Sequence, residues 1–164
     1  AIKKLGRTDI ELVMNLQGDE PLINVADIQK LHAQMVKTKF ELGTLASNII
    51  DQESYDNLNV VKVVTKESLY NSQFPEAINF ARKLNDKPKN IYKHLGIYCY
   101  KLKTLEKFVS FNQSVNEIKY RLEQLRALDN EIKINVAFAN SSPIGVDTKE
   151  DFVAIKKIME YKSK

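Results

Sequence analysis

The chain has 164 residues, of which 43% are hydrophobic and 28% charged, and this composition favours a folded globular domain over a disordered chain. No apolar run approaches the roughly 20 residues that a membrane-spanning helix requires, so we expect no membrane span. The net charge of +4 comes mainly from lysines spread along the chain, which is not the clustered basic face of a nucleic-acid-binding protein. The single cysteine, Cys99, cannot form an internal disulfide, which favours a reducing cytoplasm.

Apolar runs of strand length alternate along the chain with helical patterns. Strands are predicted at 12–16, 44–50, 60–65, 94–100 and 132–139, and helices at 24–37, 102–111, 114–130 and from 148 onward. The segment 67–84 is ambiguous, because Pro75 interrupts a helical composition. The alternation predicts an open α/β sheet with helices on both faces. Ligands of such sheets bind at loops that follow strands, which directs attention to the turns at 17–21 and 141–147.

Two stretches match the pattern of a capped helix start, Ser114 to Glu117 and Thr148 to Asp151. The first opens the helix predicted to run to about residue 130, and the second opens the last helix. The side chains expected to face the core are Ile118, Leu122, Leu125 and Leu128 in the first helix and Phe152, Ile155, Ile158 and Met159 in the second.

Two carboxylates follow predicted strands. Asp19 comes after Gly18 in the turn behind the first strand, and Asp147 precedes the last helix. On spacing alone, an acidic surface turn and ordinary helix-start chemistry explain them. Taken together, they are a plausible pair for one Mg²⁺, which is usually held by one or two carboxylates with phosphates and waters.

Four further polar side chains lie where a ligand could meet them. His94 and Tyr98 are four residues apart in a predicted strand, so their side chains can share a face. A half-buried histidine beside a core tyrosine explains this pair equally well. Glu123 and Gln124 lie off the apolar stripe of their helix, where a solvated surface is the simpler interpretation.

Five segments in this order resemble the 3-deoxy-manno-octulosonate (Kdo) cytidylyltransferases, also called CMP-Kdo synthetases. The set is more specific than any one segment, and it covers nearly the whole chain. The segments are Asn15-Leu-Gln-Gly-Asp-Glu-Pro21, Asn57-Leu-Asn-Val-Val-Lys-Val-Val64, His94-Leu-Gly-Ile-Tyr98, Leu122-Glu-Gln-Leu-Arg126 and Gly145-Val-Asp-Thr148.

The resemblance implies an open, mostly parallel, doubly wound Rossmann-like nucleotidyltransferase sheet. It also implies a homodimeric enzyme that uses CTP and Mg²⁺ to convert Kdo to CMP-Kdo and pyrophosphate, for lipopolysaccharide synthesis. By the family pattern, Asp19 and Asp147 hold Mg²⁺, and Gln17 lies near sugar and nucleotide. The residues that the pattern places on the sugar are His94, Tyr98, Glu123 and Gln124 on its hydroxyls and Arg82 on its carboxylate.

The chain also departs from the family pattern. The family begins with a strand and an Arg/Ser/Pro/Gly/Lys-rich loop that wraps the triphosphate, and no segment here matches them, so residues 1–164 are expected to form one partial nucleotidyltransferase domain. Asn79 and Ala81 stand where the family has Tyr and Ser. A non-catalytic remnant or interaction module, and a cytidylyltransferase for another acidic sugar, therefore remain as alternatives. An unpaired sheet edge would favour dimerisation or aggregation.

Overall fold

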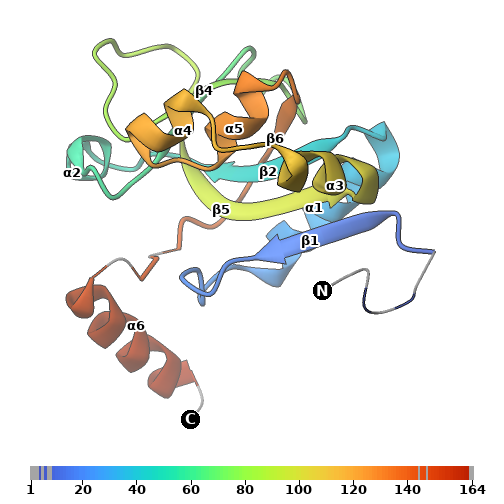
Figure 1. The fold of residues 1–164 in the computed structure, drawn as a ribbon. Helices are drawn as coiled ribbons and strands as arrows, with labels where there is room; N and C mark the ends of the chain where they lie inside the picture. The colour runs from blue at the N-terminus through green and yellow to red at the C-terminus, as the bar shows by residue number, and fades with distance from the viewer. Residues whose placement is uncertain (1–3, 5, 7–8, 144, 147, 163–164) are drawn as a thin grey trace.

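The computed structural model describes residues 4, 6, 9–143, 145, 146 and 148–162, which form an open sheet with helices on both faces (Figure 1). The strands are β1 (Leu12–Leu16), β2 (Leu42–Ser47), β3 (Lys62–Thr65), β4 (Ala77–Ala81), β5 (Ile91–Lys101) and β6 (Ile134–Phe138). The helices are α1 (Val25–Thr38), α2 (Gln52–Asp56), α3 (Leu102–Ser110), α4 (Val115–Tyr120), α5 (Gln124–Asp129) and α6 (Lys149–Lys162). None of the helices in these ranges combines the length and the apolar character that crossing a bilayer requires.

The long strand β5 organises the sheet, whose order is β4-β3-β5-β2-β6 with β1 also paired to β5. β2 pairs with β5 residues 93–100 along one edge of that strand. The other edge is shared: β3 pairs with residues 91–93 and β1 with residues 97–101. The two short strands therefore flank residues 94–96 of β5, where the sheet is split.

The strand directions confirm the open α/β sheet but not its expected pairing. β1, β2 and β3 each run antiparallel to β5, and β3 runs antiparallel to β4; β2 and β6 form the parallel pair. Strands β1, β2, β3 and β6 thus share one direction, whereas β5, which lies between them, runs in the opposite direction. The expectation of a mostly parallel sheet is therefore wrong for the strand pairing.

Each face of the sheet carries its own hydrophobic cluster. On one face, Leu31 and Met35 of α1 pack with Leu45, Leu95 and neighbouring side chains. On the other face, α3 and α5 cover a cluster that includes Phe80, Tyr92, Tyr98, Tyr100, Phe108 and Leu125. The predicted covering of both faces by helices is confirmed.

Helix α1 begins and ends much as its sequence predicts. The Asn24 side chain accepts a hydrogen bond from the Ala26 amide at 2.9 Å, which satisfies one of the first free N–H groups of the helix. Close packing on β2 depends on Gly43, because a Cβ there would lie 2.9 Å from the Met35 sulfur and 3.0 Å from a Leu31 methyl.

The helix predicted from 114 to 130 is broken in two. The capping box at Ser114 and Glu117 is present, but α4 ends at Tyr120 and Arg121 adopts a left-handed conformation with φ 54°. Ile118 is 61% exposed, so its predicted place in the core is wrong, whereas Leu122 and Leu125 are buried as expected.

Helix α6 lies apart from the main body of the sheet (Figure 1). Its predicted cap is confirmed: Asp151 N donates to Thr148 Oγ1 at 3.1 Å, and Thr148 N donates to the Asp151 carboxylate at 2.9 Å. Ile155 is buried, but Phe152 and Met159 remain at least half exposed, so their predicted inward orientation is wrong. The helix borders the turn at 18–21, with which it lines an apolar cleft.

Candidate functional site

A small polar cleft lies over the split at residues 94–96 of β5. Its volume is about 210 Å³. It is lined by Asn15, Gln17, Arg82, His94, Gly96, Tyr98, Tyr100, Phe108, Arg121, Leu122, Glu123 and Gln124. The six side chains that the family pattern assigns to substrate, at 17, 82, 94, 98, 123 and 124, thus come together from four separate segments.

The Gln17 side chain lies against the β5 backbone at Gly96. A Cβ built on Gly96 would be 2.7 Å from Gln17 Oε1, which is closer than a real Cβ approaches an atom it is not bonded to, and 3.3 Å from Gln17 Cδ, which is a tight contact. Glycine at this position therefore gives Gln17 its place in the cleft. Sequence reasoning missed Gly96, although a glycine inside a strand indicates a close approach of this kind.

His94 is a buried ring of the cleft and is 8% exposed. Its imidazole packs edge-on against Phe80 at 5.1 Å between ring centroids and lies 5.5 Å from Tyr98. Its Nε2 is 2.9 Å from Thr44 Oγ1. Burial lowers the pKa of His94 from 6.5 to about 3, so the ring is neutral at physiological pH.

The neighbouring tyrosines keep their protons. Burial, followed by the negative charge that Tyr100 and Glu123 would add, raises the pKa of Tyr98 well above its usual value. Burial likewise raises the pKa of Tyr100. Neutral Tyr98 and neutral His94 can therefore serve as hydrogen-bond partners of a ligand but do not supply charge.

The break between α4 and α5 displays Glu123 and Gln124 at the cleft. Glu123 is exposed at the start of α5, while Gln124 is 8% exposed. The Arg126 guanidinium holds the break by donating twice to the buried Glu117 carboxylate and by stacking over Phe108 at 4.8 Å. Sequence reasoning identified Glu117 only as a cap and did not find this ion pair.

Arg82 follows β4 at the rim of the cleft. One of its guanidinium nitrogens donates to the carbonyls of Leu58 and Asn59 at 3.0 and 3.2 Å. The buried Lys62 amine donates to the Arg82 carbonyl at 2.8 Å and to the Asn57 carbonyl at 2.6 Å. The 57–62 segment therefore fixes Arg82 through both its main chain and its side chain.

The turn at 17–21 meets the segment that precedes α6. Val146 N donates to the Asp19 carbonyl at 2.8 Å, and the Asp19 side chain is exposed beside this contact. The partner carboxylate of the predicted Mg²⁺ pair, Asp147, lies outside the described residues. Within the described ranges, no three His, Cys, Asp or Glu side chains gather as a metal cluster.

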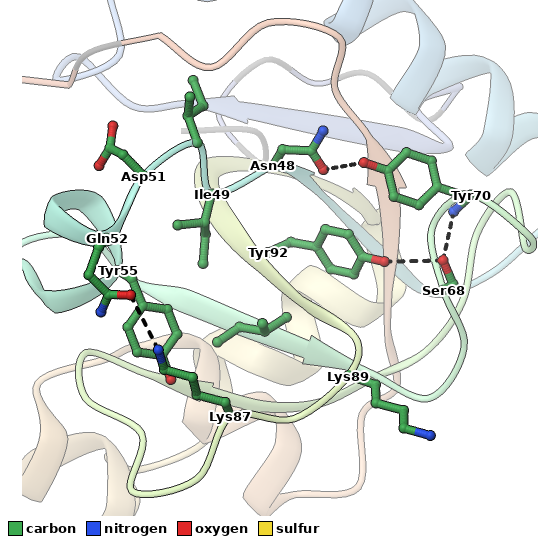
Figure 2. Close-up of a pocket in the computed structure, with 12 residues that line it drawn as sticks. Asn48, Ile49, Asp51, Gln52, Tyr55, Ser68, Tyr70, Lys87, Lys89 and Tyr92 are labelled. Carbon is green, nitrogen blue, oxygen red and sulfur yellow. Dashed lines mark hydrogen bonds between the residues drawn. The ribbon is translucent and has the colours of Figure 1, made fainter.

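A second cleft lies near the start of β5, and Figure 2 shows residues that line it. Its volume is about 820 Å³, and Asn48, Gln52, Tyr70, Lys87 and Tyr92 contribute to its walls. Tyr70 donates to Asn48 Oδ1 at 2.6 Å, and Lys87 donates to Gln52 Oε1 at 3.2 Å. These polar groups satisfy one another, and no residue that the family pattern assigns to substrate lies there.

The small cleft combines two arginines, Arg82 and Arg121, and the Glu123 carboxylate with neutral donors and acceptors, which suits a hydroxylated ligand that carries a carboxylate. With the open α/β sheet, this arrangement defines the class as a nucleotidyltransferase-type fold. The family model described as cytidylyltransferase matches residues 1–134, and the chain belongs to that family.

Relatives refine the comparison. The chain is 37% identical over 150 residues to the 3-deoxy-manno-octulosonate cytidylyltransferase of Bartonella tribocorum, covering 90% of this chain and 60% of that protein. It is 38% identical over 154 residues to the 8-amino-3,8-dideoxy-manno-octulosonate cytidylyltransferase of Shewanella sp. strain ANA-3, covering 92% and 62% respectively. The chain thus spans about three fifths of the length of these relatives.

A solved structure supports the same assignment of fold. The structure of CMP:2-keto-3-deoxy-manno-octonic acid synthetase complexed with CTP superposes with a TM-score of 0.81 at 27% identity, covering 98% of this chain and 66% of that one. The family resemblance stated from the five sequence segments is confirmed by these comparisons.

Proposed function

We propose that this chain forms the sugar-acid-binding part of a cytidylyltransferase that converts Kdo and CTP to CMP-Kdo and pyrophosphate. The observation that carries the proposal is the single cleft in which Gln17, Arg82, His94, Tyr98 and the 123–124 pair converge. The names of the relatives and of the CTP-bound structure support the same substrates.

In this reaction, the anomeric oxygen of the sugar acid forms a bond to the α-phosphorus of CTP and loses its proton to solvent. The bond from the α-phosphorus to the α–β bridging oxygen breaks, and pyrophosphate leaves with that oxygen. The chain's contribution is to hold and orient the sugar. Arg82, already fixed by the carbonyls of Leu58 and Asn59, faces the carboxylate, while Gln124 and His94 bind hydroxyl groups. Positioning of this kind accounts for a large share of the rate in phosphoryl transfer.

We propose that Asp19 and Asp147 hold Mg²⁺. The carboxylate of Asp19 is exposed, and the Val146–Asp19 hydrogen bond brings the segment before α6 to the turn that carries it. Oxygen donors from one or two carboxylates are the set that Mg²⁺ prefers, so the residues fit this ion. When bound, the ion would neutralise charge on the phosphates.

Calorimetric titration of the chain with Kdo tests the binding half of the proposal. We expect saturable binding that Gln124→Ala weakens and that Gln29→Ala, on the exposed face of α1, leaves unchanged. Equal affinities in both variants, or no binding by a folded chain, would contradict the assignment of the cleft. Pyrophosphate release with CTP, Kdo and Mg²⁺, with Asp19→Ala as control, tests whether the chain is active by itself.

A second candidate substrate is the 8-amino derivative of Kdo. The Shewanella relative named for that sugar is 38% identical to this chain, close to the value for the Kdo enzymes. Product analysis with an equimolar mixture of the two sugars distinguishes the candidates. A chain that binds neither sugar would instead fit a non-catalytic remnant of the same fold.

We further propose that the chain self-associates and acts in the cytoplasm. Self-association is supported by exposed apolar side chains on α4, where Val115 is 80% and Ile118 is 61% exposed. The cytoplasmic location is supported by Cys99, a buried free thiol. Light scattering tests the first proposal, since a monomer at all accessible concentrations would contradict it, and fractionation of cells tests the second.

A further inference from the structure

The hydroxyl of Thr44 connects the cleft to an irregularity of the sheet. The pairing of β2 with β5 shifts register between Thr44 and Leu45, opposite the stretch of β5 that contains Gly96. Thr44 is fully buried, and its Oγ1 lies 2.8 Å from the Ile97 carbonyl, 3.3 Å from the Leu95 carbonyl and 2.9 Å from His94 Nε2.

These distances determine which atom donates. A hydroxyl has one proton, and a carbonyl oxygen can only accept. If the Thr44 proton pointed at His94, two oxygen acceptors would face each other at 2.8 Å with no proton between them. The Thr44 hydroxyl therefore donates to the Ile97 carbonyl, and its lone pair accepts a hydrogen bond from His94.

We propose that Thr44 is a positioning residue that holds His94 in the Nε2–H tautomer, so that Nδ1 is an acceptor for a hydroxyl group of the bound sugar. Nδ1 has no hydrogen-bond partner among the described residues, and His94 lines the cleft. The assignment of the ligand rests on the proposed function, whereas the tautomer rests on the Thr44 contacts alone.

The polarity of this contact is specific. A neutral imidazole with an unprotonated Nδ1 binds a group that can donate, such as a sugar hydroxyl, and gains nothing from an ether or carbonyl oxygen. The aromatic neighbours Phe80 and Tyr98 carry no charge that could favour the imidazolium form. Thr44 therefore sets the direction of the hydrogen bond that His94 makes with its ligand.

The ¹⁵N chemical shifts of the His94 ring test the tautomer. The chain has two histidines, and His32→Gln, at an exposed position of α1, leaves His94 as the single signal. We expect a pyrrole-type Nε2 and a pyridine-type Nδ1, retained in Thr44→Ser and lost to a mixture of tautomers in Thr44→Val. A pyrrole-type Nδ1, or identical spectra in both variants, would overturn the proposal.

Calorimetric titration with Kdo then tests the ligand contact. Thr44→Val should weaken binding roughly tenfold, because one hydrogen bond to the sugar loses its preset acceptor, and Thr44→Ser should restore it. Unchanged affinity in Thr44→Val would overturn the contact. If the spectra agree and the unaltered chain does not bind Kdo, the proposed function and the ligand contact fail together while the tautomer assignment holds.

Discussion

Replacing Gly96 by alanine should weaken ligand binding in the cleft without lowering the stability of the fold. The new methyl group would lie 2.7 Å from Gln17 Oε1, so the Gln17 side chain must rotate away from β5. Since the displaced atoms belong to the end of a flexible side chain, the fold can adjust at little cost. Alanine also restricts the unfolded chain, which stabilises a protein by about 0.4–1 kcal/mol where the backbone conformation is compatible.

We therefore expect Gly96→Ala to be as stable as the unaltered chain, or more so, while Kdo affinity falls roughly three- to tenfold through loss of the Gln17 contact. Calorimetry and thermal unfolding measure the two quantities. In a double-mutant cycle, Gly96→Ala should have no further effect on affinity once Gln17→Ala is present. Additive losses of affinity, or destabilisation beyond about 2 kcal/mol, would refute the reasoning.

Three further predictions concern groups around the cleft. Glu117→Gln should destabilise the chain by about 2 kcal/mol in chemical denaturation, since it weakens charge-assisted hydrogen bonds from Arg126. The Arg126 hydrogen bond lowers the pKa of Glu117 below 4.5, so the stabilisation is full above pH 4.5 and is lost at lower pH. The stability of the variant should therefore depend less on pH in the acid range. Because burial lowers the pKa of His94 from 6.5 to about 3, its ring should show no NMR titration between pH 8 and 5, and an NMR titration midpoint near 6.5 would contradict its burial. Its contribution to stability should decline as pH drops below 6.5, because the unfolded chain then binds a proton that the folded chain does not. Cys99 is fully buried and its pKa is raised to about 11 by burial, so a thiol reagent should modify it only after denaturant is added, and rapid reaction of the native chain would contradict this.

Much of the fold follows from local signals in the sequence. Strand β1 occupies the predicted residues 12–16, and the caps at Asn24, Ser114 and Thr148 lie where their side chains predict helix starts. Caps are readable because the donor and the acceptor lie within three residues of each other. The direction of β5 cannot be predicted in this way, because a buried apolar strand can pair with either parallel or antiparallel neighbours.

The break at Arg121 shows why the site could not be derived from periodicity. Ile118, Leu122 and Leu125 have helical spacing, which predicts an unbroken helix. In such a helix, Glu117 and Arg126 would point to opposite sides, since nine residues turn through about 900°. Their ion pair therefore requires the break, and this tertiary contact outweighs the local pattern.

The site residues themselves came from the family pattern rather than from spacing. Spacing alone favoured a solvated face for Glu123 and Gln124, and it did not single out Thr44, Gly96 or Arg121. These residues lie in the cleft or beside it because β1, β5 and the α4–α5 break meet there. Such a meeting of distant segments depends on the sheet order, which local sequence signals do not specify.

The most direct test of the account is an NMR titration of the folded chain with Kdo, in which the amide signals of the two clefts are compared. We expect saturable shifts at His94, Tyr98 and Gln124, and unchanged signals at Tyr70 and Gln52 in the cleft of Figure 2. Shifts confined to the second cleft, or none in either cleft at tens of millimolar Kdo, would contradict the claim that the split beside β5 binds the sugar acid.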